Sequence, residues 1–426
     1  MEDSAAELGM GATDTAGRMD AAMGLAGPVE IAFKPCFDTV NAGVLFSLPA
    51  LLAQGLLSHS DKQFSLPAGY YRLTSIFLLL AFMALSRLKC VESLRYCSPG
   101  EWGKVLGLDR VPEVRTLRKK IAHLAQGDKP AQWSGKLCSQ WMQAAPDNAG
   151  ALYVDGHVRV YHGKLAHPPK HYVARQKLCL RASVDYWVNA MEGEPFFSVP
   201  KDISPGLINV LEEEIVPRLL QDVPNQPSVE ALEADPLLHR FTVVFDREGY
   251  SPDLFLRLKD KRVACLTYHK FPKENWNVVE FQTYSVKLAS GQVVDMRLAE
   301  RGVQLTNKLW LREVRKLTDT GHQTSILSTD YKTGNTRLAP RMFARWSQEN
   351  FFKYMRENFS LDRLVEHCAE EIPAPETVQV VNPEYRSLDQ AARKTQGQLN
   401  RRLAAVGSLT MPPLSAPSGV SVGKLR

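Results

Sequence analysis

The first third of the chain carries its apolar residues at the spacing of helices. The densest run, LTSIFLLLAFMAL at 73–85, is thirteen residues long. A helix that crosses a bilayer needs about 20 apolar residues, so we expect a buried helix here and no membrane partner. The apolar positions of 43–57 also predict a helix. Residues 29–145 as a whole are predicted to form a helical domain.

Beyond this domain the apolar runs become shorter and alternate with helical patterns. The runs at 150–155 and 239–246 read as buried strands that each end in an aspartate. Residues 203–220 and 252–261 have helical spacing. The order strand, helix, strand, helix is typical of an α/β core, so we predict a mixed sheet flanked by helices.

This core is predicted to be split in the sequence, over 146–262 and 337–370. The residues between, 263–336, form strand-like runs separated by turn residues. They predict a mostly antiparallel β-rich insertion whose last strand or two can rejoin the core sheet. Residues 340–360 then predict a single helix.

Both ends of the chain have the composition of unfolded segments. Residues 1–28 hold five acids and one base among Ala, Gly and Met, and are predicted to be a disordered tail. Residues 371–426 are predicted to comprise a linker with three prolines, a polar helix at 384–406 and a disordered Pro/Ser-rich C-terminal tail.

The composition excludes several classes of protein. Hydrophobic residues make up 44% and charged residues 23%, which supplies a core and excludes a wholly disordered chain. The net charge of +6 permits a nucleic-acid partner. The seven cysteines contain no C-x-x-C pair, so we expect buried, reduced thiols in a cytoplasmic protein. No P-loop and no G-x-G-x-x-G motif is present, so nucleotide-driven chemistry is not supported.

One segment of the helical domain is strongly basic. Residues 110–120 hold one acid, Glu113, and five bases: Arg110, Arg115, Arg118, Lys119 and Lys120. Two short helices, a glycine-bearing turn and this basic helix suggest a helix-turn-helix-like DNA-binding module. The alternative is an ordinary solvated helix face.

Three acids form the main candidate site. Asp155 and Asp246 each follow a buried strand, and polar ligands gather at the carboxyl ends of strands in α/β sheets. Glu349 lies in the predicted helix 340–360, on the face formed by Met342, Arg345, Glu349, Lys353 and Arg356. Carboxylates held together in this way suit Mg²⁺ or Mn²⁺ and phosphodiester chemistry. Each acid alone could instead be a turn, cap or salt-bridge residue.

The same regions resemble a known family. VDGHVRVYHG, FDREGYSPDLF and RWSQENFFKYM look like the three signature blocks of DDE transposases, in the group of bacterial insertion-sequence enzymes with a Y-R-E-K signature. The resemblance implies an RNase H-like catalytic core with the β-rich insertion before the last catalytic helix. It also implies that Asp155, Asp246 and Glu349 bind the catalytic metals.

Further roles follow from this resemblance. Arg345 and Glu349 match the signature at its required spacing, whereas Met342 replaces the Tyr and Arg356 the Lys. Arg247, Arg345, Lys353 and Arg356 would contact DNA, because cations of this kind meet phosphate oxygens. Trp276 and Trp310 in the insertion are candidates for stacking on a flipped base, with a core role as the alternative.

The sequence therefore predicts a DNA transposase that cleaves and joins strands at the terminal inverted repeats of an insertion sequence. Double-stranded DNA is the expected partner, Mg²⁺ or Mn²⁺ the expected cofactor, and a homodimer the expected active form. The expected location is the cytoplasm, in association with the nucleoid. The alternatives are an inactive transposase-derived DNA-binding protein and an RNase H-like nuclease without joining activity.

Overall fold

The computed structural model describes residues 13–362, except 37, 165–166, 174–175, 203, 273, 289 and 344–345, together with some residues between 387 and 403. The chain divides into two units, Met1–His367 and Cys368–Arg426. In the second unit the described residues, within 387–403, are helical. The predicted linker and C-terminal tail lie outside the described residues.

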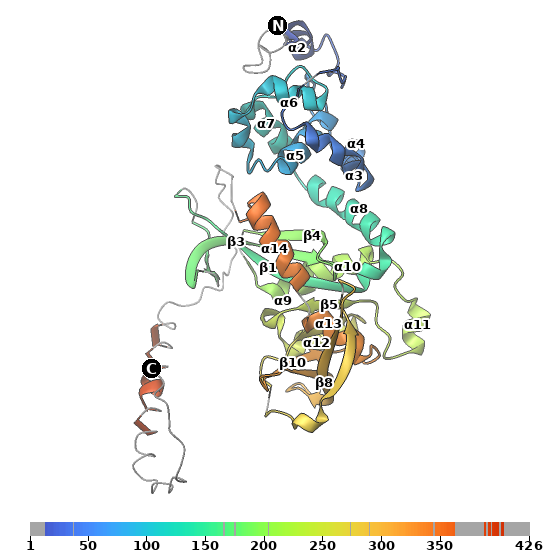
Figure 1. Cartoon of the computed structure of the whole chain (residues 1–426), viewed down its shortest axis with the longest axis vertical. Coiled ribbons are helices and arrows are strands. Elements are labelled where there is room, and N and C mark those ends of the chain that lie inside the picture. Colours follow the sequence, from blue (N-terminus) through green and yellow to red (C-terminus); the bar gives the residue numbers. More distant parts are fainter. Residues whose placement is uncertain are drawn as a thin grey trace. The chain divides into compact units, whose positions relative to one another are not determined.

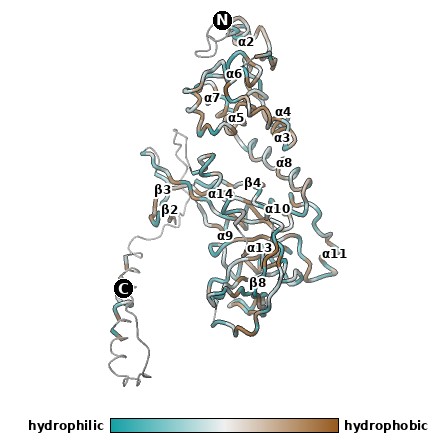
Figure 2. The backbone as a smooth tube through the Cα atoms, viewed as in Figure 1, coloured by the Kyte–Doolittle hydropathy of each residue, from teal (hydrophilic) through white to brown (hydrophobic). Residues whose placement is uncertain are grey.

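The N-terminal part of the first unit is a helical module, as predicted (Figure 1). Its buried centre is α5, and the apolar residues of this helix are drawn in brown in Figure 2. No helix among the described residues is long and apolar enough to cross a membrane. The helices of the module are α2 (Thr15–Met23), η1 (Ala42–Ser47), α3 (Leu48–Ala53), α4 (Ser60–Gln63), α5 (Leu73–Leu85), η2 (Val91–Tyr96), α6 (Pro99–Leu106), α7 (Val114–Leu124) and α8 (Lys129–Ala144).

The prediction of disorder over residues 1–28 is wrong for α2. This helix docks through Arg18, whose guanidinium donates to both carboxylate oxygens of Asp109 and lies 4.0 Å from the ring centre of Tyr70. Composition could not reveal this contact, because its partners lie more than fifty residues further along the chain. A second correction concerns the cysteines: of the six described, only Cys138 and Cys265 are buried, whereas Cys36 is exposed and the other three are partly buried.

Helices α6 and α7 pack closely because of a glycine. Gly103 is buried within α6, and a Cβ atom added there would lie 2.6 Å from the Cα of Arg110 in the turn before α7. Gly107 ends α6 with a φ of 65°, which favours glycine. The turn that leads into the basic helix α7 therefore depends on Gly103, which has no side chain to collide with it.

We expect Gly103→Ala to destabilise the protein by about 1–3 kcal/mol, because the added methyl group overlaps backbone that cannot move away freely. Gly135→Ala in α8 is the matched control. There the nearest atom to an added Cβ is 3.8 Å away, so alanine should stabilise the helix by about 0.5–1 kcal/mol. Chemical denaturation followed by tryptophan fluorescence measures both. Equal effects at the two glycines would contradict the proposed close packing.

The rest of the first unit is built on one large mixed sheet. Its strand order among the described residues is β2-β3-β1-β5-β6-β10-β9-β8-β7, with β4 paired to β3. Strands β1, β5 and β6 are parallel, and the other pairings are antiparallel. The strands are β1 (Ala151–Val160), β2 (Lys170–Val173), β3 (Leu178–Asn189), β4 (Pro195–Lys201), β5 (Thr242–Phe245), β6 (Ala264–Tyr268), β7 (Gln282–Lys287), β8 (Val293–Gln304), β9 (Trp310–Leu317) and β10 (Gln323–Ser328).

The predicted β-rich region, 263–336, needs one change. Strands β7 to β10 are antiparallel, and β10 rejoins the sheet beside β6, as expected. Strand β6, however, pairs in parallel with β5 and therefore belongs to the core sheet rather than to an antiparallel insertion. An isolated run such as ACLTY cannot show this, because its partner strand decides the direction of pairing.

Helices cover both faces of the sheet. One core cluster joins Leu152, Val154 and Phe245 of the strands to Leu219 of α10 and Leu254 of α12. The helices in or near this layer are η3 (Pro146–Gly150), α9 (Leu207–Val210), the π-helix η4 (Leu211–Ile215), α10 (Val216–Asp222), α11 (Val229–Ala234), η5 (Arg247–Gly249) and α12 (Pro252–Asp260).

The opposite face packs against the last helices of this unit. Tyr153 and Val244 of the sheet contact a second core cluster that contains Leu338 and Met342 of α13 (Asn335–Phe343). Helix α14 (Trp346–Phe359) follows α13. The region predicted as a helix over 340–360 is helical over Asn335–Phe343 and Trp346–Phe359, and residues 344–345 lie outside the described residues. The one-turn helix η6 (Val278–Glu280) lies before β7.

Candidate active site

Asp155 and Asp246 are neighbours in the sheet. The parallel pairing of β1 with β5 ends at Val154 opposite Phe245, so both aspartates follow directly after the last paired residues. Tyr153 and Val244, two residues earlier, are also paired and lie in the core cluster beneath α13. Because strand side chains alternate between faces, both aspartates belong to the face that α13 covers.

Asp155 does not end its strand, contrary to the prediction. Strand β1 continues to Val160 through its pairing with β3, in which Asp155 lies opposite Trp187. The carboxylate accepts a hydrogen bond from the N–H of Gly156 at 2.9 Å. The pairing of β1 with β5 thus stops just before Asp155, whereas the pairing with β3 continues. Asp155 therefore lies at an edge of the parallel part of the sheet.

Asp246 begins a tight turn. Its Oδ1 accepts a hydrogen bond from the N–H of Glu248 at 2.8 Å, and its carbonyl oxygen accepts one from Thr267 Oγ1 at 3.0 Å. Gly249 closes the turn against Phe245, where an added Cβ would lie 2.5 Å from a ring carbon. These contacts hold the Asp246 backbone beside the end of β5.

Helix α14 presents the third acid. Glu349 is exposed and forms no ion pair within the part of the chain that the structure describes. On a neighbouring side of the helix, Gln348 donates to Asn189 Oδ1 at 3.2 Å, and Phe352 stacks on His157 with ring centres 5.0 Å apart. Asn189 is paired with Tyr153, two residues before Asp155, and His157 lies two residues after Asp155. The contacts of α14 therefore lie on both sides of Asp155, and the helix crosses the sheet at the level of this residue.

Two further contacts anchor α14. Phe351 packs against Trp187, the residue opposite Asp155, with ring centres 5.3 Å apart. His157 Nε2 lies 2.6 Å from the carboxylate of Asp362 just after α14. Sequence reasoning missed Asp362 as the partner of His157, because the only signal was the position of His157 two residues after Asp155.

The predicted basic stripe is only partly assembled. Met342 is fully buried on α13. Arg345 lies outside the described residues. Lys353 is exposed on α14, and Arg356 is half-buried, where its Nε donates to the carbonyl of Phe352. Arg247 is exposed directly after Asp246, with its guanidinium 5.7 Å from the ring centre of Tyr268.

The two aspartates form a fitting donor pair for a hard cation. Mg²⁺ is usually held by one or two protein carboxylates together with waters and substrate phosphates. Within the described residues, no three His, Cys, Asp or Glu side chains are grouped closely enough to hold a metal ion by themselves. Asp155 and Asp246 are the two carboxylates that the sheet brings to adjacent strand positions, and Glu349 lies on α14.

The five bases of 110–120 differ in availability. Arg115 and Lys119 are exposed on α7, whereas Arg118 forms an ion pair with Glu92 at 3.1 Å. Partial burial lowers the pKa of Lys120, and Arg110 is half-buried in the turn before the helix. Arg115 and Lys119 are thus the two bases best placed for a phosphate. Of the tryptophans in the β-rich region, Trp276 is buried beneath Arg315, whereas Trp310 is largely exposed.

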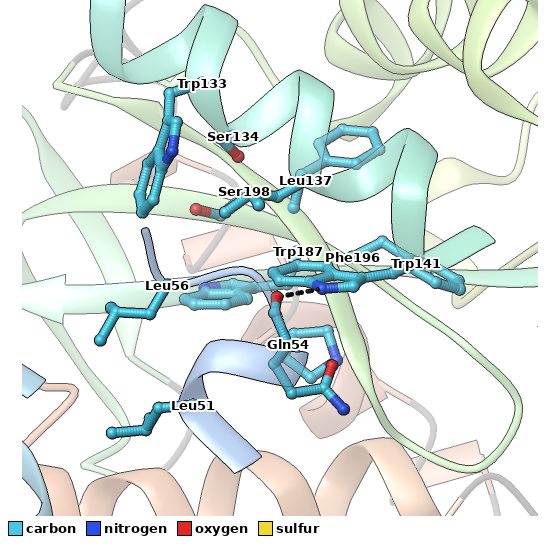
Figure 3. Close-up of a pocket in the computed structure, with 12 residues that line it drawn as sticks. Leu51, Gln54, Leu56, Trp133, Ser134, Leu137, Trp141, Trp187, Phe196 and Ser198 are labelled. Carbon is cyan, nitrogen blue, oxygen red and sulfur yellow. Dashed lines mark hydrogen bonds between the residues drawn. The ribbon is translucent and has the colours of Figure 1, made fainter. Parts of the chain in front are cut away.

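Helix α8 ties the helical module to the sheet. Its Trp141 and Trp133 donate to the carbonyl oxygens of Gln54 and Ser58, both at 2.8 Å. Figure 3 shows these tryptophans around an apolar cavity of about 380 Å³, with Trp187 on its sheet side. A second link joins the helical module to α14, where Arg87 donates to the Tyr354 hydroxyl at 2.9 Å.

Comparison with known proteins gives a family match. A family described as transposase protein matches residues 9–415. A cryo-EM structure of piggyBac transposase in a synaptic complex with hairpin DNA is similar at a TM-score of 0.35 and 11% identity, over 78% of this chain and 70% of that chain. No curated protein matches the sequence.

Proposed function

The chain belongs to a family of transposase proteins, and on that premise we propose that it cleaves and joins DNA strands at the ends of a mobile element. The observation that carries this proposal is that Asp155 and Asp246 lie side by side, directly after the parallel pairing of β1 with β5 ends. Strand order β4-β3-β1-β5-β6, with β1, β5 and β6 parallel, supports an RNase H-like core. The bacterial insertion-sequence group and the DDE class are parts of the same proposal.

The proposed chemistry assigns a role to each acid. A bound Mg²⁺ or Mn²⁺ would polarise the phosphodiester and lower the pKa of the attacking water or hydroxyl. Asp155 and Asp246 would hold that cation, since the turn at Asp246 and the β1–β3 pairing fix their backbones. Glu349 would complete the site from α14, and Arg247, Lys353 and Arg356 would hold phosphate oxygens of the DNA.

DNA recognition is proposed for the helical module. Arg115 and Lys119 lie on one exposed side of α7, four residues apart, where both can reach the same DNA backbone. A homodimer would hold two element ends together, and the expected setting is the nucleoid. About half of the residues in the predicted helix 384–406, which could serve dimerisation, are described, and these are helical.

The test is cleavage of the element's own terminal-repeat DNA with Mg²⁺ or Mn²⁺, in wild type and in Glu349→Ala. We expect metal-dependent cutting by the wild type and loss of cutting in Glu349→Ala. Glu357→Ala is the matched control, because Glu357 is also an exposed glutamate of α14. It should cut like the wild type.

The products separate the alternatives. Joined strand-transfer products identify a transposase, whereas free ends alone identify a nuclease of the same fold. Tight binding of the repeat without cutting, by wild type and both variants, would favour an inactive DNA-binding derivative. Met342, which stands where the signature has Tyr, packs in the core between α13 and the sheet.

A further inference from the structure

A long basic stretch of the chain begins directly after Asp155. Residues 156–184 contain six bases and four histidines but no acid, whereas the segment is bounded by Asp155 and Asp185. Its formal charge of +6 equals the net charge of the whole chain, so the remaining residues are neutral in sum. The bases are Arg159, Lys164, Lys170, Arg175, Lys177 and Arg181.

This segment forms an arm at one end of the sheet. Pairing of β1 with β5 stops at Val154, but β1 continues against β3 as far as Val160 opposite Ala182. Strand β2 then adds to β3, with Lys170 opposite Arg181. We call the three-stranded part formed by residues 156–184 the basic arm. In Figure 1, β3 runs on as a curved ribbon away from β5.

Three of the six bases in the basic arm have no acidic partner among the described residues. Lys164, Lys170 and Lys177 are exposed and form no ion pair in the part of the chain that the structure describes. Arg159 is the exception, because Asp185 lies 2.8 Å from its guanidinium. Arg181 instead contacts a ring nitrogen of His167 at 2.7 Å.

The register adds a second observation that points to an anion. Lys170 and Arg181 are directly opposite each other in the antiparallel pair, so their side chains share one face at close range. Like charges in that position are destabilising, and a bound anion would relieve the repulsion. Tyr172, two residues after Lys170, lies on the same face and is 60% exposed.

This face is continuous with the candidate active site. Arg181 lies six residues before Trp187 on β3, and Trp187 is opposite Asp155, so Arg181 and Asp155 belong to the same face. Six residues of strand span about 20 Å. Duplex DNA advances about 3.4 Å per base pair, so this distance corresponds to about six base pairs from the carboxylates.

We propose that the basic arm binds the phosphate backbone of duplex DNA beside the point of cleavage, which rests on the proposed function. Repeated phosphates match a row of unpaired cations, and an exposed tyrosine among them is a common companion of nucleic-acid surfaces. The arm is separate from the basic helix α7. It would hold the DNA next to the carboxylates, whereas α7 would hold it in the helical module.

The test uses the full chain with Lys164→Gln, Lys170→Gln and Lys177→Gln combined. Binding of a terminal-repeat duplex and of an unrelated target duplex is measured over a range of salt concentrations. Each lost phosphate contact should reduce the slope of log K against log salt by about 0.9, so we expect a reduction of about two to three. The control combines Lys129→Gln, Lys261→Gln and Lys287→Gln, three exposed lysines elsewhere, and should keep the wild-type slope.

The outcomes are distinct. A reduced slope with the terminal repeat assigns the arm to the element end, and a reduced slope with the other duplex assigns it to the target DNA. An unchanged slope with both would overturn the proposal, as would equal losses in the control. Lost binding to anionic lipid vesicles, with the duplexes bound as before, would also overturn it. If the wild type binds DNA through the basic arm but does not cut it, the proposed role of the arm holds and the proposed catalytic function is wrong.

Discussion

Asp246→Asn is expected to lower strand cleavage by about a thousandfold or more, the largest effect of any single change in this protein. The amide has the shape of the carboxylate and can still accept the hydrogen bond from the Glu248 N–H that forms the turn. What it loses is the negative charge beside Asp155. The variant should therefore fold and bind DNA like the wild type while it fails to hold the cation.

Two measurements check this prediction. Calorimetric titration with Mn²⁺ should show binding that is lost in Asp246→Asn, and the cleavage assay should show the loss of cutting. Asp260→Asn is the matched control, because Asp260 is an exposed aspartate at the end of α12, outside the carboxylate pair. If Asp246→Asn cut at near the wild-type rate, the assignment of the active site would be wrong.

The sequence predicted those parts of the fold that depend on local pattern. The run at 73–85 was long enough and apolar enough to predict a buried helix, and α5 has the same bounds. The runs directly before Asp155 and Asp246 were predicted as buried strands because nearly all of their residues are apolar, with Thr242 as the exception in β5. Their parallel pairing, however, is a long-range property that no local spacing shows.

The parts that were missed depend on contacts between distant residues. Helix α2 is held by Arg18 on Asp109, so its composition alone suggested disorder. In helix α14, Gln348 and Phe352 meet Asn189 and His157, whereas Tyr354 is half-exposed. No local spacing shows which side of this helix meets those distant partners.

A buried ionic cluster in the β-rich region should respond strongly to mutation. Glu313 on β9 is 4% exposed, and its Oε1 accepts hydrogen bonds from Ser325 Oγ and Arg315 Nε, both at 2.7 Å. Arg315 is itself 2% exposed and lies against the ring of Trp276. The two buried charges therefore depend on each other.

Glu313→Gln is expected to destabilise the protein by about 3–5 kcal/mol, because it leaves the Arg315 guanidinium buried without its counter-charge. Thermal and chemical unfolding measure this loss. Glu280→Gln is the control: Glu280 pairs with Arg301 in a bidentate contact near the surface, where water screens the charges, so little change is expected. Similar losses in both variants would contradict the special role of the buried pair.

The same cluster predicts how stability changes with pH. Burial of Glu313 opposes its ionisation, but hydrogen bonds from His269, Ser325 and Arg315 outweigh this and lower the pKa to about 2, from an ordinary value of 4.5. A carboxylate with a lowered pKa stabilises the fold fully above pH 4.5, and this contribution is lost as the pH falls toward about 2. Glu313→Gln has no proton to gain in that range. Its free energy of unfolding should therefore fall less steeply between pH 4.5 and 2 than that of the wild type, and parallel curves would show that Glu313 does not carry the acid sensitivity.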